Sequence, residues 1–168
     1  AQKENLSLLI DAEESEFRIA FERLLICNHI LAKQVVPRMK EIKYGRIINI
    51  TSTSVKQVIR GLGVSNTIRG SVAQWAKTLA LELGEFGITV NNILPGFTRT
   101  NRLDELAIKN ANFEGKTVED IFKTWASNNS INRIGDVKEI AESVAFLASG
   151  SSSFITGHDL VVDGGRFK

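Results

Sequence analysis

A strand, a helix and a second strand follow one another in the middle of the chain, and this order most constrains the possible fold. Residues 45–51 contain an apolar, isoleucine-rich run. A glycine-punctuated loop and an amphipathic segment follow, and a second apolar run at residues 88–94 stops at Pro95-Gly96. Two largely apolar strands joined by a crossover helix are parallel neighbours in a sheet. The sequence therefore predicts an α/β fold with a parallel sheet.

The helix between these strands has a well-defined apolar face. Ser65 is expected to cap its start by accepting a hydrogen bond from a free backbone N–H, and Gly84 and Gly87 suit its end. Residues spaced three or four apart lie on one side of a helix with 3.6 residues per turn. Those residues are Ile68, Val72, Trp75, Ala76, Leu79, Ala80 and Leu83. We expect a helix over residues 65–84 that covers one face of the sheet.

A long helix is expected before the first strand, over residues 14–40. Asp11 and Glu14 have the three-residue spacing of a capping box at its start. The apolar stripe of this helix consists of Phe17, Ala20, Phe21, Leu24, Leu25, Leu31, Ala32 and Val35. Pro37 is expected to end or kink it. Asn28 falls within the stripe, where a polar side chain needs a partner such as a backbone carbonyl.

The C-terminal third predicts further helices and a short strand. Residues 103–127 have a helical pattern with a break at Gly115, after which Thr117 caps the second segment. Asp136 opens another capped helix, and residues 160–162 form a last strand. The expected inward face of the helix after Asp136 consists of Val137, Ile140, Ala141, Val144, Ala145 and Ala148.

Composition narrows the classes of function. The chain has 168 residues, 43% hydrophobic and 24% charged, as in an ordinary single soluble domain. The net charge is +2 with no basic run, which does not favour nucleic-acid binding. Cys27 is the one cysteine, and no segment resembles a secretory signal or a membrane span. His29 and His158 are far apart in the sequence. We expect a cytoplasmic protein without a metal site and without nucleic-acid or membrane partners.

Several motifs in order resemble the short-chain dehydrogenase/reductase family. They are Asn49-Ile50-Thr51-Ser52, Lys77–Leu83, Val90–Gly96, Ile155-Thr156-Gly157 and Val162–Gly165. The resemblance implies the C-terminal part of a doubly wound, Rossmann-type parallel sheet with long flanking helices. It also implies hydride transfer between NAD or NADP and a small carbonyl or alcohol. Residues 1–168 would be one incomplete domain, with residues 100–130 as its variable substrate lobe.

The resemblance also implies roles for particular residues. Ser52 matches the catalytic serine, and Asn28 matches the helix asparagine that supports a proton relay through a bound water. The Pro95-Gly96 turn would hold the nicotinamide carboxamide, and Thr98 and Thr100 would reach the carboxamide or a phosphate. Thr100 is also a good N-cap for the segment after it, and both roles are compatible.

The family's catalytic tyrosine and lysine are replaced in this chain. They align with Ser65 and Arg69, while the one tyrosine, Tyr44, is followed four residues later by Ile48. A serine hydroxyl ionises far above the pKa of a tyrosine, so Ser65 cannot serve as the same base. Arg69 keeps a fixed charge and can orient a ribose hydroxyl or a polarised carbonyl. The Ser-Asn-x-x-Arg pattern resembles a divergent subgroup related to 3-oxoacyl-carrier-protein reductases.

The family's glycine-rich phosphate loop is absent from this sequence. The strand at 45–51 would therefore be a bare apolar edge. Three explanations remain: a longer parent protein, which the alanine at position 1 favours, a short chain that dimerises, or a partner that supplies the missing half. The resemblance implies that the helices at 14–40 and 65–84 form a homo-oligomer contact. The function is either oxidoreduction or that of a catalytically inert binding or dimerisation module, and the chain alone is expected to be an inactive fragment.

Overall fold

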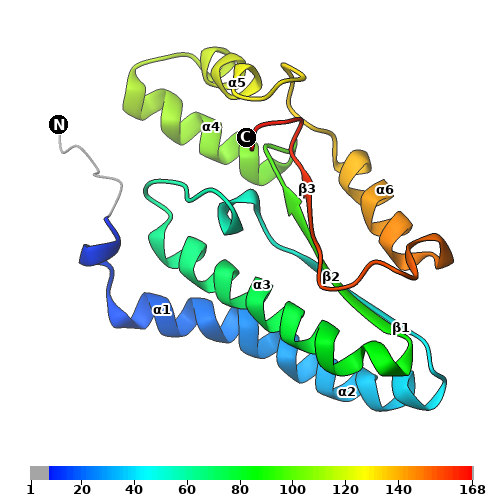
Figure 1. Cartoon of the computed structure of the whole chain (residues 1–168). Helices are drawn as coiled ribbons and strands as arrows, with labels where there is room; N and C mark the ends of the chain where they lie inside the picture. The colour runs from blue at the N-terminus through cyan, green and yellow to red at the C-terminus, as the bar shows by residue number, and fades with distance from the viewer. Residues whose placement is uncertain (1–7, 168) are drawn as a thin grey trace.

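A three-stranded parallel sheet lies at the centre of the protein (Figure 1). The computed structural model describes residues 8–167. Strands β1 (Gly45–Ile50), β2 (Ile88–Pro95) and β3 (Asp159–Val162) lie in the order β1-β2-β3. The central strand β2 is buried along almost its whole length, as expected for a parallel sheet covered on both faces. The predicted α/β class and both predicted central strands are confirmed.

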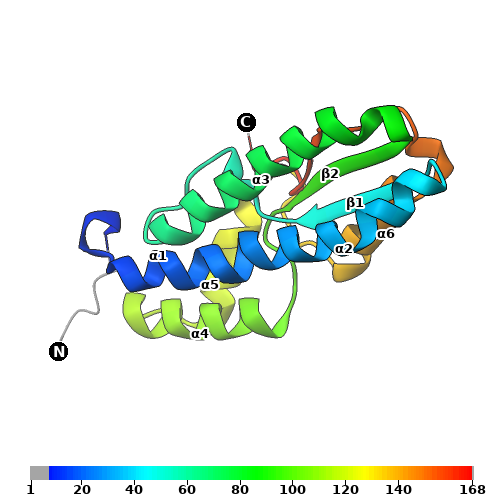
Figure 2. The ribbon, with the colours of Figure 1, turned by 90° about the horizontal axis from the view of Figure 1, so that it is seen from below.

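Long helices cover the two faces of this sheet. Helix α3 (Gly63–Leu83) packs on β2, and α6 (Val137–Ala148) lies on the opposite face (Figures 1 and 2). Helices α1 (Glu14–Phe21) and α2 (Cys27–Glu41) form one long rod beside α3. A π-helical turn at Glu22–Ile26 joins α1 to α2.

Two hydrophobic clusters stabilise the arrangement. In the first, the apolar face of α3 packs against β2 through Ala76, Ala80, Leu83, Ile88 and Val90. In the second, α4 (Asn101–Glu114) and α5 (Val118–Ser127) pack together around Trp125. The break between α4 and α5 falls at Gly115, which adopts a left-handed conformation with φ of 65°, and Thr117 caps α5. The expected break and the expected cap are both confirmed.

Two expectations about helix starts are wrong, and a third, about Pro37, is decided only in part. Helix α3 begins at Gly63, so Ser65 lies inside its first turn and does not cap it. The capping box of α1 is formed by Glu13 and Glu16, two residues after the predicted pair. Helix α2 continues through Pro37 to Glu41, so Pro37 does not end the helix.

The start of α3 is set by a tertiary contact. A Cβ atom on Gly63 would lie 2.7 Å from the Cβ of Leu9, so the backbone packs directly on the N-terminal turn at Leu9–Asp11. Only glycine allows so close an approach. This contact lies outside the helix and was not available from the helical pattern.

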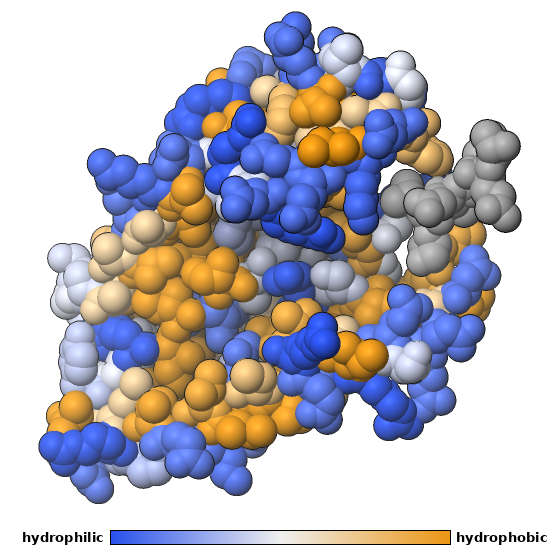
Figure 3. All heavy atoms as spheres, turned by 180° about the vertical axis from the view of Figure 1, so that it is seen from behind, coloured by the Kyte–Doolittle hydropathy of each residue, from blue (hydrophilic) through white to orange (hydrophobic). Residues whose placement is uncertain are grey.

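The edge of the sheet formed by β1 is open. Among the described residues β1 pairs only with β2, and its Ile50 is 51% exposed. The predicted inward face of α6 is wrong for most of its members, because Ala141, Ala145 and Ala148 are exposed and Val137 is 54% exposed. Within residues 8–167, the extensive contacts of α6 are with the three strands and with the turn at Gly150–Ser152. No other described element covers the exposed residues of α6 to a similar extent. Figure 3 shows hydrophobic surface gathered on this side.

Candidate active site at the carboxyl ends of β1 and β2

Ser52 lies two residues after the end of β1, at the carboxyl edge of the sheet where ligands of open α/β folds bind. Its hydroxyl oxygen accepts a hydrogen bond from the backbone N–H of Ser54 at 3.1 Å and so caps a short 3-10 turn, Thr53–Val55. The backbone N–H of Thr51 donates to the carbonyl of Ile93 at 2.8 Å, which extends the strand pairing up to this turn. Ser52 is half-buried.

Arg69 joins the first turns of α3 to the end of β1. Its Nε donates to the hydroxyl oxygen of Ser65 at 3.1 Å, and its Nη1 donates to the carbonyl of Thr51 at 3.1 Å. Partial burial lowers the pKa of Arg69 from its usual value, although a guanidinium remains charged at neutral pH. Ser65 and Arg69 are thus bonded to one another and held beside the residue that precedes Ser52.

Asn28 makes the backbone contact that its position in the apolar stripe required. Its Nδ2 donates to the carbonyl of Leu24 at 2.8 Å, inside the π-helical turn that precedes α2. The predicted amide-to-carbonyl bond is confirmed. Among the described residues no hydrogen bond joins Asn28 to Ser52, Ser65 or Arg69, so the structure does not connect it to the other candidate residues.

The turn after β2 is held firmly against the end of β3. The backbone N–H of Gly96 donates to the carbonyl of Val162 at 2.9 Å. A Cβ atom on Gly96 would lie 2.6 Å from the Cβ of Asp163, so only glycine fits here. Thr98 donates to the Gly96 carbonyl at 3.2 Å, and Thr100 accepts from the backbone N–H of Leu103 at 3.2 Å. The expected N-cap role of Thr100 is confirmed.

An open cleft of about 460 Å³ lies beside this turn. Four of the five predicted cofactor residues line it: Pro95, Gly96, Thr98 and Thr100. Its remaining lining is largely apolar and consists of Ile50, Arg102, Leu103, Val137, Ile140, Ala141 and Val144. Arg69 is not among the lining residues. The cleft lies on the open side of the sheet and combines polar groups from the turn with an apolar wall.

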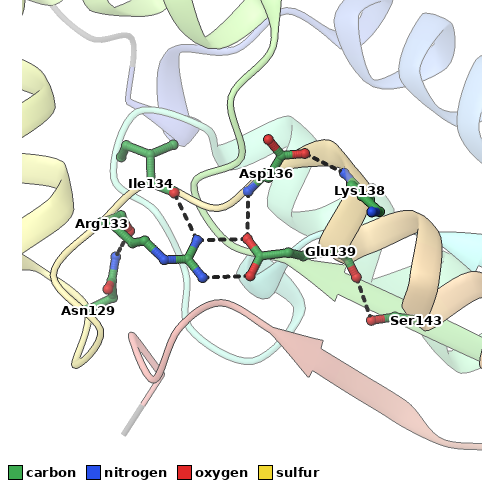
Figure 4. A network of polar contacts seen from close by, with 7 residues as sticks. All are labelled: Asn129, Arg133, Ile134, Asp136, Lys138, Glu139 and Ser143. Carbon is green, nitrogen blue, oxygen red and sulfur yellow. Dashed lines mark hydrogen bonds and ion pairs between the residues drawn. The ribbon is translucent and has the colours of Figure 1, made fainter.

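A polar network that sequence reasoning missed fixes the loop opposite this turn (Figure 4). Arg133 donates two hydrogen bonds to the carboxylate of Glu139, at 2.8 and 2.6 Å. The hydrogen bond from Arg133, together with one from the backbone N–H of Asp136, lowers the pKa of Glu139 to about 2. The loop also holds Gly135, which exchanges backbone hydrogen bonds with residues 97 and 99 at 2.9 Å. Only the capping-box spacing of Asp136 and Glu139 was visible in the sequence.

Within residues 8–167 no group of three or more histidine, cysteine, aspartate or glutamate side chains is arranged to hold a metal ion. No helix in that range is long and apolar enough to cross a membrane.

Comparison with known proteins places the chain in a family. The sequence profile described as Enoyl-(Acyl carrier protein) reductase matches residues 2–166. The chain belongs to the short-chain dehydrogenase/reductase family and is similar to its 3-oxoacyl-carrier-protein reductases. It is 31% identical over 161 residues to the 3-oxoacyl-[acyl-carrier-protein] reductase FabG of Buchnera aphidicola (subsp. Acyrthosiphon pisum), covering 96% of this chain and 62% of the relative.

Another relative and a solved structure also match this chain over part of their length. The short-chain reductase protein NovJ of Streptomyces niveus is 38% identical over 130 residues, or 76% of this chain and 47% of NovJ. The crystal structure of L-sorbose reductase from Gluconobacter frateurii, complexed with NADPH and L-sorbose, superposes with a TM-score of 0.90 at 26% identity. That match covers 96% of this chain and 62% of the reductase. The chain thus spans about half to three-fifths of the length of such relatives, and the predicted Rossmann-type fold is confirmed for that part.

Proposed function

We propose that the chain is the C-terminal part of an oxidoreductase that transfers hydride between NAD or NADP and a small carbonyl or alcohol substrate. A 3-oxoacyl thioester is the first substrate to test, because FabG is among the relatives. The observation that carries the proposal is the placement of Arg69, whose guanidinium binds Ser65 and the carbonyl of Thr51 next to Ser52. This arrangement puts a hydroxyl donor and a fixed cation at one edge of the sheet.

Each of these groups has a role that its chemistry allows. The Ser52 hydroxyl donates a hydrogen bond to the substrate carbonyl oxygen. Arg69 stabilises the negative charge that develops on that oxygen, or orients a ribose hydroxyl. Ser65 accepts from Arg69 and thereby aims the guanidinium. Because neither Ser65 nor Arg69 is a proton donor near neutral pH, water supplies the proton of the alcohol, and Asn28 is the residue that we propose to hold such a water.

The turn after β2 fits the nicotinamide end of the cofactor. Gly96 packs closely on Asp163 because it has no side chain, and Gly96, Thr98 and Thr100 all line the cleft. Pro95 and Arg69 complete the proposed binding set. NAD(P)H supplies the hydride when it is bound. The phosphate-binding half of the cradle is not part of this sequence, so we expect the longer protein to bind the cofactor far more tightly than residues 1–168.

The same proposal assigns the remaining parts of the chain. Residues 1–168 belong to one domain, in which α4 and α5 form a substrate lobe within residues 100–130. The long helices at residues 14–40 and 65–84 form the contact of a homo-oligomer. The exposed Ile30, Leu31 and Val35 of α2 support that contact, because large apolar side chains are seldom exposed in a row without a partner. A cytoplasmic location is consistent with the free, exposed Cys27.

A second function, an inert binding or dimerisation module, is favoured by the loss of the tyrosine and lysine. A cofactor titration followed by a turnover assay separates the two. Trp125 stacks on Phe97 at 4.9 Å between ring centroids, next to the proposed cofactor turn, and so reports on binding by its emission. We expect saturable quenching by NADPH or NADH in the full-length protein, then reduction of a carbonyl substrate.

Substitutions refine this test. Ser52→Ala is expected to remove turnover. The matched change Ser71→Ala, in the same helix as Ser65 and Arg69 but bonded among the described residues to the Thr67 carbonyl, is expected to leave it unchanged. Cofactor binding without turnover of any carbonyl substrate indicates the inert module. In that case Ser65→Tyr combined with Arg69→Lys tests whether the rest of the site still supports chemistry, because activity returns only if it does.

A further inference from the structure

A row of polar side chains crosses the whole sheet on one level. Asn49 of β1, Asn92 of β2 and Asp159 of β3 are Cα partners in the strand pairing. Asn49 Nδ2 donates to Asn92 Oδ1 at 3.0 Å, and Asn92 Nδ2 donates to Asp159 Oδ1 at 2.8 Å. We call these three residues the polar rung. All three are buried, so the rung ends in a carboxylate that must be neutralised.

Two lysines from different segments neutralise that carboxylate. Lys77 Nζ of α3 lies 2.8 Å from Asp159 Oδ2, and Lys56 Nζ lies 3.0 Å from the same oxygen. The side chain of Asp159 is 3% exposed, while those of Lys56 and Lys77 are 37% and 39% exposed. One lysine is enough to balance one carboxylate. The second ion pair therefore needs a reason other than charge balance.

Lys56 ends the turn that carries Ser52. The backbone of this turn is closed by hydrogen bonds from Val55 N to Ser52 O at 3.1 Å and from Lys56 N to Thr53 O at 2.9 Å. At its start, the carbonyl of Thr51 is held by Arg69. At its end, Lys56 is held by Asp159. The segment from Thr51 to Lys56 is thus fixed at both ends. Helix α3 holds its start directly, through Arg69. The Asp159 carboxylate, which also binds Lys77 of α3, holds its end.

We propose that Lys56 is a positioning residue, which acts through Asp159 to hold the Ser52 turn at a fixed distance from Ser65 and Arg69. The proposal rests on the proposed function for the importance of Ser52, but the tether itself is a separate claim. Lys77 contributes to the same ion pair network from helix α3 and is not part of the turn. The two lysines therefore form a matched pair of variants with different expected effects.

Hydrogen exchange of the full-length protein tests the tether without any need for activity. In Lys56→Gln, the amides of residues 54–57 are expected to exchange about fivefold faster, the change that follows from losing one partly exposed ion pair. In Lys77→Gln, the amides of the Ser52 turn are expected to keep the wild-type rate. Lys56→Arg is expected to restore slow exchange because it keeps the charge. Equal exchange in the wild type and Lys56→Gln, or equal acceleration in both lysine variants, would overturn the tether.

Turnover tests the catalytic consequence. If the protein reduces a carbonyl substrate, Lys56→Gln is expected to lower kcat about tenfold with KM within about twofold, because the binding groups stay in place. Lys77→Gln is expected to change kcat by less than about twofold, and Lys56→Arg to recover most of the loss. Unchanged kcat in Lys56→Gln, despite faster exchange, refutes the positioning role. Absence of turnover in the wild type refutes the proposed function instead, and the exchange result still decides the tether.

Discussion

Removing the amide of Asn92 is the sharpest test of how the sheet is held together. Asn92 is fully buried and makes two side-chain hydrogen bonds, one of them to the Asp159 carboxylate. A hydrogen bond to a charged group contributes about 1.5–3 kcal/mol, and a neutral one about 1 kcal/mol. Asn92→Ala is therefore expected to lower the free energy of unfolding by about 2.5–4 kcal/mol. This is a large share of the roughly 5–15 kcal/mol of a typical domain.

The neighbouring asparagine provides a matched control. Asn91 has the same residue type and similar burial, but both its partners are neutral backbone groups: it donates to Ile155 O at 2.8 Å and accepts from His158 N at 3.0 Å. Asn91→Ala is expected to cost about 2 kcal/mol. Urea unfolding followed by circular dichroism measures both changes as shifts in midpoint at constant m-value. If Asn92→Ala costs no more than Asn91→Ala, the charged end of the polar rung adds nothing to stability and the reasoning fails.

Two further predictions concern the loops around the cleft. Because the pKa of Glu139 in the folded protein is lowered to about 2 from 4.5, its ionised form stabilises the fold above pH 4.5 and this contribution is lost as the pH falls through about 2. Glu139→Gln should therefore be less stable than wild type at neutral pH and equal to it below about pH 2, as read from unfolding midpoints across that range; a constant gap would contradict this. Thr100→Ala removes the N-cap of α4 and should lower stability by about 1 kcal/mol in thermal unfolding, whereas Thr98→Ser, which keeps its hydroxyl, should not.

The parts of the fold that sequence predicts well are those fixed by local patterns. The apolar runs of β1 and β2 and the spacing of the face of α3 each depend on residues within one element. The caps at Thr100, Thr117 and Asp136 are equally local, since each joins a side chain to a backbone N–H two or three residues away. Such features carry their own physical cause in the sequence, and the structure confirms these strands and these three caps, although the equally local caps expected at Asp11 and Ser65 are not formed.

The features that were missed depend on contacts between distant segments. The start of α3 is moved by the packing of Gly63 on Leu9, and no helical pattern contains that contact. The polar rung needs the register of all three strands, which brings together residues 43 and 67 positions apart. The expectation for the inward face of α6 is wrong because a partner is missing, not because of a contact between distant segments. Its apolar spacing was correctly identified, but the described chain offers nothing to bury it.

The candidate site residues also divide into those that local patterns predict and those that depend on contacts between distant segments. Ser52 was located by its place after a strand and by family spacing, and it lies at the predicted edge. The bond between Ser65 and Arg69 follows from their four-residue spacing on one helix, since such pairs lie on the same face. The second bond of Arg69, to the carbonyl of Thr51, joins α3 to β1 and was not foreseen. Arg133 and Lys56 act across loops, where no periodicity signals a partner.

The polar rung also sets the order in which a newly made chain can finish folding. Asp159 follows Asn92 by 67 residues, so during synthesis the central strand exists for some time before its carboxylate partner. Until then the amide of Asn92 has to remain in water, and β2 cannot be sealed under α3 without leaving that amide unpaired. We therefore expect closure of the sheet to wait for β3. In a ribosome-bound chain that stops before Asp159, we expect β2 to stay exposed. It could then bind chaperones or pair with edge strands of other chains.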